Sequence, residues 1–192
     1  MAQDTTTILI AGIGGQGIVL ASDLLAVAAL NSGYDVKVSE IHGMAQRSGS
    51  VSTSVRFGKE VDTMITDAGS ADILISFETT EALRNLSCMK EGAALIVNDS
   101  TYKPVSALTG QVPMPENPQA TIKSLGGIVL SAKSLAVEAG VARASNVVLL
   151  GYLSKYLPFS LDSWKDAIQR RVPAKFVEGN LRAFELGRNY QA

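Results

Sequence analysis

The sequence is poor in the residues that build metal and redox centres. Its 192 residues include one cysteine, Cys88, and one histidine, His42. One thiol cannot form an internal disulfide, and it cannot supply the four thiolates of an iron–sulfur cluster. A zinc site normally needs several histidine or cysteine ligands. We therefore expect this chain to carry no metal centre of its own.

Charge is also scarce, and neither sign is in excess. Charged residues make up 18% of the chain, against roughly 25% in typical soluble domains. The 17 Lys and Arg residues nearly balance the 18 Asp and Glu residues, which gives a formal net charge of −1. Nucleic-acid binding requires a basic surface, so we expect no nucleic-acid partner. The low charge fits a surface covered by another protein, and it equally fits a parallel sheet buried between helices.

The first 30 residues lack the features of a targeting or membrane segment. The opening MAQDTTT carries no basic residue, and the apolar stretch that follows is interrupted by GIGGQG. A signal peptide needs a basic start and a continuous apolar run, and a membrane helix needs about 20 apolar residues. The sequence therefore predicts a cytoplasmic protein without a membrane span.

What the sequence does contain is ample apolar material in a strand–helix rhythm. Hydrophobic residues make up 46% of the chain, and the mean hydropathy is +0.19. We expect strands at 7–11, 35–40, 50–57, 72–77, 93–98, about 110–112 and 127–131, and helices at 18–30, 79–89, 146–156, 161–171 and 174–187. Residues 102–118, with four prolines, are expected to form a loop.

This rhythm predicts an α/β fold, a Rossmann-like three-layer α/β/α sandwich with a mostly parallel sheet and a helical C-terminal third. We expect one domain over residues 1–192. Within it, residues 1–131 would form the Rossmann-like core and residues 132–192 the helical part.

A glycine-rich loop lies between the first expected strand and the first expected helix. Gly12, Gly14, Gly15, Gln16 and Gly17 belong to GIGGQG, which satisfies the GxGxxG pattern. In such loops the glycines allow a tight turn, a close approach to a phosphate and close packing of helix on strand. The free N–H groups of the first helical turn then form an anion site.

This loop permits more than one function. Glu40 ends the second expected strand, where a dinucleotide-binding enzyme places its ribose-binding acid, so a stand-alone NAD(P)- or FAD-binding oxidoreductase is one alternative. The loop would otherwise serve only to pack the helix on the sheet. A Rossmann enzyme runs from its second strand into a crossover helix, whereas here residues 41–49 leave little room for one.

The segment after Glu40 carries a second group of polar residues. In EIHGMAQRSGSV, His42 directly precedes Gly43, and Gln46 and Arg47 lie between Gly43 and Gly49, ahead of the next strand. The segment begins at the carboxyl end of a strand, where open α/β sheets bind ligands. We expect residues 43–49 to lie beside residues 12–17 and to form a notch in which Arg47 binds an anion through two hydrogen bonds. The alternative is that His42 and Arg47 brace the loop or a subunit contact.

Together, GIGGQG and EIHGMAQRSGSV resemble the gamma-type subunits and domains of 2-oxoacid:ferredoxin oxidoreductases, in particular the small subunits of the indolepyruvate enzymes. The chain departs from that pattern at Ser48, where the family usually has glycine. The C-terminal segments NVVLLG (146–151), LPF (157–159) and NLRAF (180–184) are similar to the family as well.

The resemblance implies a reaction that this chain does not carry out alone. In the family, a 2-oxoacid is decarboxylated on thiamine diphosphate, electrons leave through iron–sulfur clusters to ferredoxin, and the acyl group passes to coenzyme A. Thiamine diphosphate, Mg²⁺ and the 4Fe–4S clusters are then expected in a larger alpha subunit. The resemblance assigns no catalytic residue to this chain, and a contact with coenzyme A is the cofactor role it implies. The pyruvate and 2-oxoglutarate enzymes of the same family remain alternatives.

Overall fold

The protein is described by a computed structural model that covers residues 5–42 and 49–191, with the side chains of residues 42, 105 and 106 left aside. The strands are β1 (Thr6–Ile13), β2 (Asp35–His42), β3 (Ser50–Gly58), β4 (Ala71–Ser76), β5 (Met89–Asn98) and β6 (Ile128–Leu130). The helices are α1 (Ile18–Asn31), α2 (Thr79–Arg84), α3 (Val105–Leu108), α4 (Pro118–Ser124), α5 (Ala132–Glu138), α6 (Ser145–Leu153), α7 (Leu161–Arg171) and α8 (Ala174–Asn189), with short 3₁₀ turns at Leu86–Cys88 and Ser154–Tyr156.

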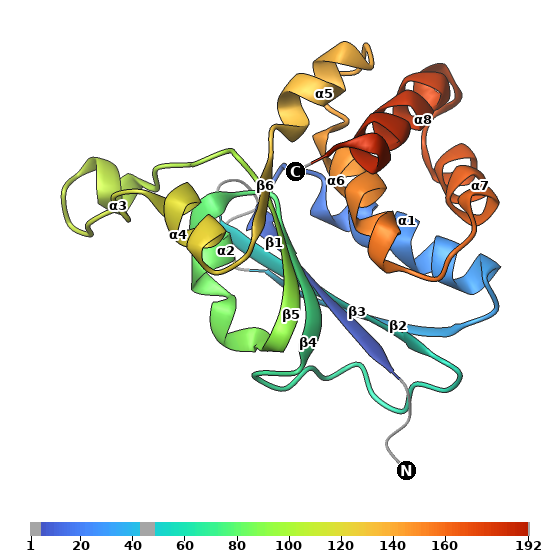
Figure 1. Ribbon diagram of the computed structural model, residues 1–192, viewed down its shortest axis with the longest axis horizontal. Helices are drawn as coiled ribbons and strands as arrows, with labels where there is room; N and C mark the ends of the chain where they lie inside the picture. Colours follow the sequence, from blue (N-terminus) through green and yellow to red (C-terminus); the bar gives the residue numbers. More distant parts are fainter. Residues whose placement is uncertain (1–4, 43–48, 192) are drawn as a thin grey trace.

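The sheet has the strand order β2-β3-β1-β4-β5-β6 (Figure 1). β1, β4, β5 and β6 pair in parallel, whereas β3 is antiparallel to both β1 and β2. The sequence prediction of a mostly parallel α/β sheet is therefore confirmed, and β2 and β3 form an antiparallel pair. β3 lies between β2 and β1, so the carboxyl ends of β1 and β2 are separated by one strand.

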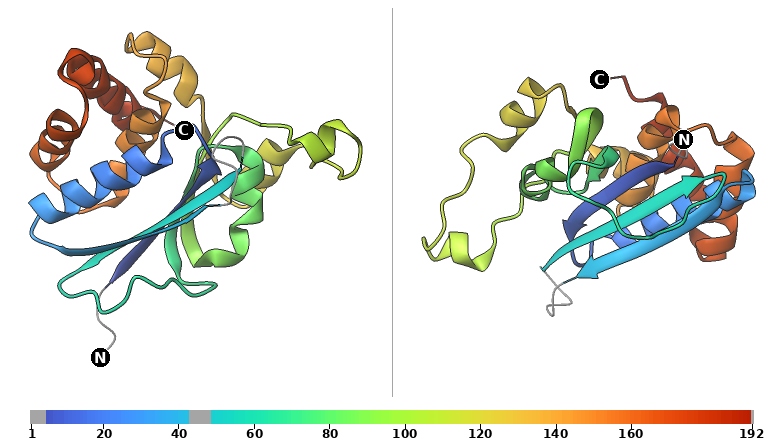
Figure 2. Two further views of the ribbon diagram at one scale, coloured as in Figure 1. Left: turned by 180° about the vertical axis from the view of Figure 1, so that it is seen from behind. Right: turned by 90° about the horizontal axis from the view of Figure 1, so that it is seen from below.

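Helices cover the sheet on both faces (Figures 1 and 2). α1, α6, α7 and α8 lie on one face, where Trp164, Phe184 and Leu149 are almost completely buried in the larger hydrophobic core. α2 and α4 lie on the other face over a smaller core that includes Leu74 and Ile122. The larger core unites strands of residues 1–131 with helices of residues 132–192, and the division of the chain at residue 131 stays a prediction.

The helix expected at 79–89 and the strand expected near 110–112 differ in the structure. The helix expected at 79–89 ends at Arg84, because Glu78 caps a short α2 and Met89 pairs with Ala71 as the first residue of β5. The strand expected near 110–112 is wrong. Gly110, at a φ of 74°, instead follows the one-turn helix α3, as glycine commonly does at a helix end.

α4 was not predicted, although its start signal is present in the sequence. Asn117 accepts a hydrogen bond from the Ala120 N–H at 3.1 Å, and Pro118 occupies the first helical position.

In the described part of the chain, no helix is long and apolar enough to cross a membrane.

Candidate functional site

The glycine-rich loop folds back on the end of β1. Gln16 closes it, because its side-chain Oε1 accepts the Ile13 N–H at 2.8 Å while its own N–H donates to the Ile13 carbonyl at 3.1 Å. A Cβ on Gly12 would lie 2.6 Å from Gln16 Oε1 and 3.1 Å from the Cβ of Phe77, so this position has no room for a side chain. Gln16 therefore braces the loop as well as lining the pocket described below.

The loop is also locked to α6. Gly17 has a φ of 80°, in the left-handed region that favours glycine. Its carbonyl accepts a hydrogen bond from Asn146 Nδ2 at 3.2 Å, and a Cβ on Gly17 would lie 2.7 Å from that nitrogen. Asn146 is buried at the start of α6, 129 residues further along the chain. Two distant segments thus fit closely against each other, and both the positive φ and the short distance to Asn146 favour glycine at position 17.

The loop expected to lie beside the glycines is only partly described. His42 is the last residue of β2, where it pairs with Val51, and its side chain is not described. Gln46 and Arg47 lie outside the described residues. The following residue that is described, Gly49, accepts a hydrogen bond from the Gly14 N–H at 2.9 Å. That contact places one end of the segment against the glycine loop, and the anion-binding notch stays a prediction.

A pocket of about 1170 Å³ opens beside the glycine loop at the carboxyl ends of β1, β4 and β5. One wall consists of Gly15–Gly17, Phe77 and residues 98–100, and the other belongs to α5, α6, α8 and the turn at residues 140–144. From β1 the chain adds β2 and β3 on one side of the sheet and then β4, β5 and β6 on the other. Ligands bind at such switch points in open α/β sheets.

The pocket combines cationic and apolar groups. Lys133 and Arg143 line it and are exposed, while the carboxylate Asp99 is held by a hydrogen bond from the Ser131 hydroxyl. The N-terminal ends of α1 and α6 lie at the same pocket, and the first N–H groups of α1 have no acceptor within that helix. Val172, Pro173 and Phe176 add an apolar rim. This arrangement suits an extended ligand with phosphate groups and an apolar portion.

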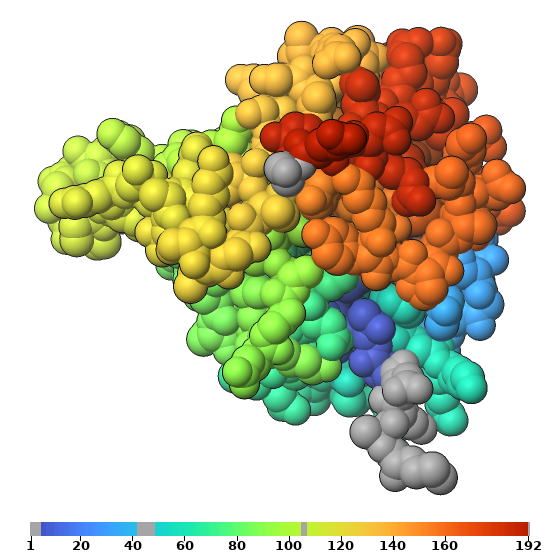
Figure 3. Space-filling view, viewed as in Figure 1, coloured from blue at the N-terminus to red at the C-terminus, as the bar shows by residue number. Residues whose placement is uncertain are grey.

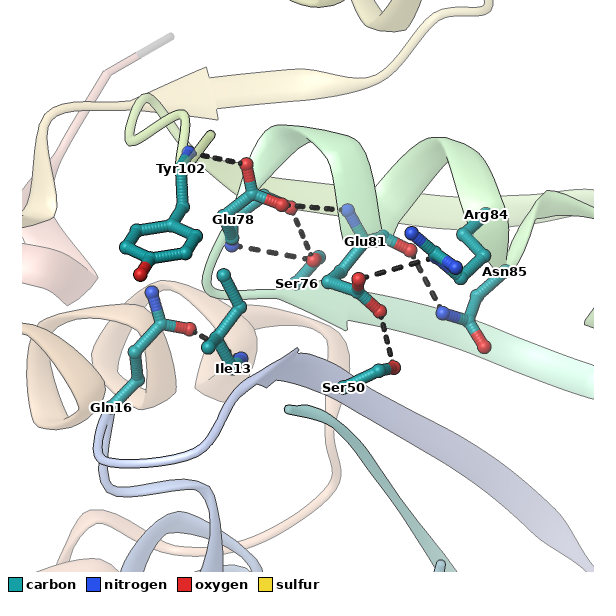
Figure 4. A network of polar contacts seen from close by, with 9 residues as sticks. All are labelled: Ile13, Gln16, Ser50, Ser76, Glu78, Glu81, Arg84, Asn85 and Tyr102. Atoms are coloured by element: carbon teal, nitrogen blue, oxygen red, sulfur yellow. Dashed lines mark hydrogen bonds and ion pairs between the residues drawn. The ribbon is translucent and has the colours of Figure 1, made fainter. Parts of the chain in front are cut away.

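Two buried carboxylates organise the neighbouring wall (Figure 4). Glu78 is fully buried, and its two oxygens accept the N–H groups of Glu81 and Tyr102, both at 2.8 Å. Glu81 accepts a hydrogen bond from the Ser50 hydroxyl at 2.6 Å and pairs with Arg84 Nε at 3.2 Å. Glu78 therefore serves as the N-cap of α2, and this pair ties α2 to β3 and to the segment after β5.

Sequence reasoning missed most of the pocket. Asn146, Lys133 and Arg143 lie more than 100 residues from the glycine loop, and no local pattern connects them to it. Residues 98–100 carried a usable signal, because polar residues directly after a parallel strand commonly face the ligand crevice. Among the described residues, no group of three His, Cys, Asp or Glu side chains is placed to hold a metal ion.

Glu40 does not lie where a dinucleotide-binding enzyme needs its acid. It is exposed on β2, and β3 separates β2 from β1. Neighbouring strands are about 4.8 Å apart, so Glu40 and the end of β1 are separated by about 10 Å across the sheet. The glycine loop and its pocket thus define a Rossmann-like α/β subunit in which the usual ribose site is absent from the described residues.

The comparisons with known proteins show the family to which this chain belongs. The model of the pyruvate ferredoxin/flavodoxin oxidoreductase family matches residues 7–190, and the chain belongs to that family. It is 42% identical over 187 residues to indolepyruvate oxidoreductase subunit IorB of Thermococcus kodakarensis, covering 94% of this chain and 93% of that protein.

Two solved structures share this fold. The gamma subunit of a keto/oxoacid ferredoxin oxidoreductase from Geobacter sulfurreducens superposes with a TM-score of 0.70 at 26% identity, covering 95% of each chain. The 2-oxoglutarate:ferredoxin oxidoreductase of Magnetococcus marinus, with coenzyme A bound, gives a TM-score of 0.73 at 21% identity. The fold covers 98% of this chain and 31% of that one.

Proposed function

We propose that this chain is the small subunit of a cytoplasmic indolepyruvate:ferredoxin oxidoreductase and carries neither the thiamine diphosphate nor the iron–sulfur clusters. The observation that carries the proposal is the 42% identity to an indolepyruvate oxidoreductase subunit over almost the whole of both chains. A larger alpha subunit would hold thiamine diphosphate, Mg²⁺ and the iron–sulfur clusters, and would pass electrons to ferredoxin. The single cysteine fits this division of labour, because a cluster needs about four thiolates.

The pocket beside the glycine loop is the place we assign to coenzyme A. Its fit rests on the donor set: Lys133, Arg143 and the N-terminal N–H groups of α1 suit the phosphates. The apolar rim at Val172, Pro173 and Phe176 suits the less polar parts of the molecule. Bound there, coenzyme A supplies the thiol that accepts the acyl group, while residues of this chain bind and orient it.

The activity is tested by coexpressing the chain with the larger subunit and following ferredoxin reduction. Indolepyruvate should be oxidised with a higher kcat/KM than pyruvate or 2-oxoglutarate, and the chain alone should show no turnover. Turnover by the isolated chain would contradict the proposal. A preference for pyruvate or 2-oxoglutarate would move the chain to another branch of the family.

The coenzyme A site is tested in the assembled enzyme with Lys133→Ala combined with Arg143→Ala. Each charge-assisted contact is worth about 1.5–3 kcal/mol, so the KM for coenzyme A should rise about tenfold or more, while the KM for the 2-oxoacid stays unchanged. Arg170→Ala is the control, because this arginine pairs with Asp166 on α7. An unchanged KM for coenzyme A in the double variant would show that coenzyme A does not bind in this pocket. Arg47→Ala tests the predicted notch in the same assay.

A stand-alone NAD(P)- or FAD-binding enzyme is the alternative from another class. The position of Glu40, two strands away from the glycine loop, argues against it. Calorimetry with NAD(H) and NADP(H) should show weak binding. A Kd in the low micromolar range, which corresponds to a binding free energy of about −8 kcal/mol, would favour the stand-alone enzyme over the proposed subunit.

A further inference from the structure

Residues 102–117 form a projecting arm that stands away from the body of the molecule (Figures 1 and 3). The arm leaves the sheet after β5 and returns at the start of α4, and α3 is the helix within it. Val97 and Ile122 are the core residues that precede and follow it. Among the described side chains, none of residues 99–121 belongs to either hydrophobic core. The arm therefore contributes little to the stability of its own domain.

The arm exposes two large apolar side chains and carries little charge. Leu108 is 68% exposed and Val112 is 51% exposed, and Lys103 and Glu116 are the charged residues in the arm's sequence. Burying a leucine or valine side chain is worth about 1.5–3 kcal/mol, so leaving both in water forgoes a sizeable stabilisation. A binding partner would recover it.

Both ends of the arm are fixed. The Tyr102 N–H donates to the buried carboxylate of Glu78, and the hydroxyls of Thr79 and Thr101 lie within hydrogen-bond distance at 2.7 Å. At the other end, Asn117 caps α4. Because its base is held rigidly, the arm loses less conformational entropy on docking than a free loop of the same length.

The size of the arm favours a groove over a second arm as its binding site. A stable interface buries about 800 Å² on each partner. Two arms meeting tip to tip would offer little more than the single turn of α3, whereas a groove contacts an inserted arm on several sides. The matching fold in the Magnetococcus marinus enzyme spans 31% of its chain, so there it is joined to more than twice its own length of further protein.

From these observations we infer that the arm inserts Leu108 and Val112 into an apolar groove on the larger subunit of the enzyme. This inference rests on the function proposed above. It names an interaction surface that is separate from the pocket, because none of the described residues of the arm lines the pocket.

The test measures the affinity of the chain for the coexpressed larger subunit by biolayer interferometry. Leu108→Asp combined with Val112→Asp should raise the Kd about thirtyfold or more, as expected for central interface residues. Leu108→Ile combined with Val112→Ile should keep the Kd within about threefold of the wild type. The matched control is Leu30→Asp combined with Val137→Asp, since both residues are 57% exposed but lie on α1 and α5.

The outcomes separate a failure of the inference about the arm from a failure of the proposed function. Loss of binding in the arm variant alone, with an unchanged melting temperature, supports the inference. Equal losses in the arm variant and the control overturn it, as does unchanged binding of the arm variant. If the wild-type chain does not bind the larger subunit at all, the proposed function itself fails. A monomer–dimer equilibrium of the isolated chain that the arm variant abolishes would assign the arm to a second copy instead.

Discussion

The two walls of the pocket are held in place by different forces. On one side, α6 and α8 pack so closely that a Cβ on Gly151 would lie 2.0 Å from the Phe184 carbonyl, and one on Gly187 would lie 1.9 Å from the Val148 carbonyl. On the other side, the buried carboxylates Glu78 and Glu81 hold α2 and the segment after β5 through hydrogen bonds. The first wall therefore depends on glycines that leave room for close helix packing. The second depends on buried carboxylates that accept hydrogen bonds.

The largest effect is expected from Gly187→Ala in the packed wall. An alanine inside a helix normally gains about 1 kcal/mol over glycine, but here its methyl group would meet a backbone carbonyl that cannot move aside alone. We expect a loss of about 3 kcal/mol, which lowers the melting temperature by about 6–12 °C. Thermal denaturation measures it, with Glu185→Ala on the exposed face of α8 as the control. A stabilised Gly187→Ala variant would show that the helices are not in direct contact.

Glu78→Gln should weaken the hydrogen-bonded wall by a smaller amount. Both oxygens of Glu78 accept backbone N–H groups, and the amide places an NH₂ group against one of these donors. The cost of one unsatisfied buried group is about 1–3 kcal/mol. Urea denaturation of this variant is compared with that of Glu91→Gln, at an exposed position on β5. Equal stability of the two variants would mean that Glu78 holds nothing in place.

Gly17 and Asn146 connect the glycine loop to the packed wall, and a double-mutant cycle measures this link. Gly17→Ala should cost about 1–2 kcal/mol from its positive φ, and more from the contact with Asn146. In an Asn146→Ala background the cost of the contact with Asn146 should disappear. The two substitutions should therefore show a coupling free energy of about 0.5 kcal/mol or more. Gly33→Ala has a similar φ of 84° but open space around its Cβ, so it should show no coupling to Asn146→Ala.

The smallest effect is expected for Tyr152, near the C-terminal end of α6, where the stability should change only at alkaline pH. Burial and a hydrogen bond with Tyr156 raise the pKa of Tyr152 to about 12 from the ordinary value of 10. The folded state holds this proton more tightly than the unfolded state, so its contribution is complete below pH 10 and is lost between pH 10 and 12. Burial lowers the pKa of Lys155 from its ordinary value of 10.5, so its contribution changes in the opposite direction and is complete by about pH 10.5.

Tyr152→Phe isolates the tyrosine, because it removes this proton and leaves Lys155 in place. The variant should lose less stability than the wild type between pH 10 and 12, as measured by urea denaturation at each pH. Parallel pH profiles of the two proteins would contradict the raised pKa.

Local patterns predicted the elements whose signals are complete within a few residues. GIGGQG after TILIA predicted the turn between β1 and α1, and the short segment after Glu40 predicted that no long helix separates β2 from β3. The helix expected at 79–89 was too long, because the pairing of Met89 with Ala71 overrode a sequence that is compatible with a helix. In α4, the Asn117–Pro118 start signal lies within a proline-rich stretch whose composition predicts a loop.

The sequence by itself determined the α/β class, the position of the glycine loop and the family, since these depend on periodicity and on motifs of contiguous residues. Only the tertiary structure decided that β3 lies between β2 and β1, which moves Glu40 away from the loop. It alone brought Asn146, Lys133 and Arg143 to the pocket. The physical reason is that strand order and helix packing are set by the burial of apolar surface between distant segments, which no short stretch of sequence encodes.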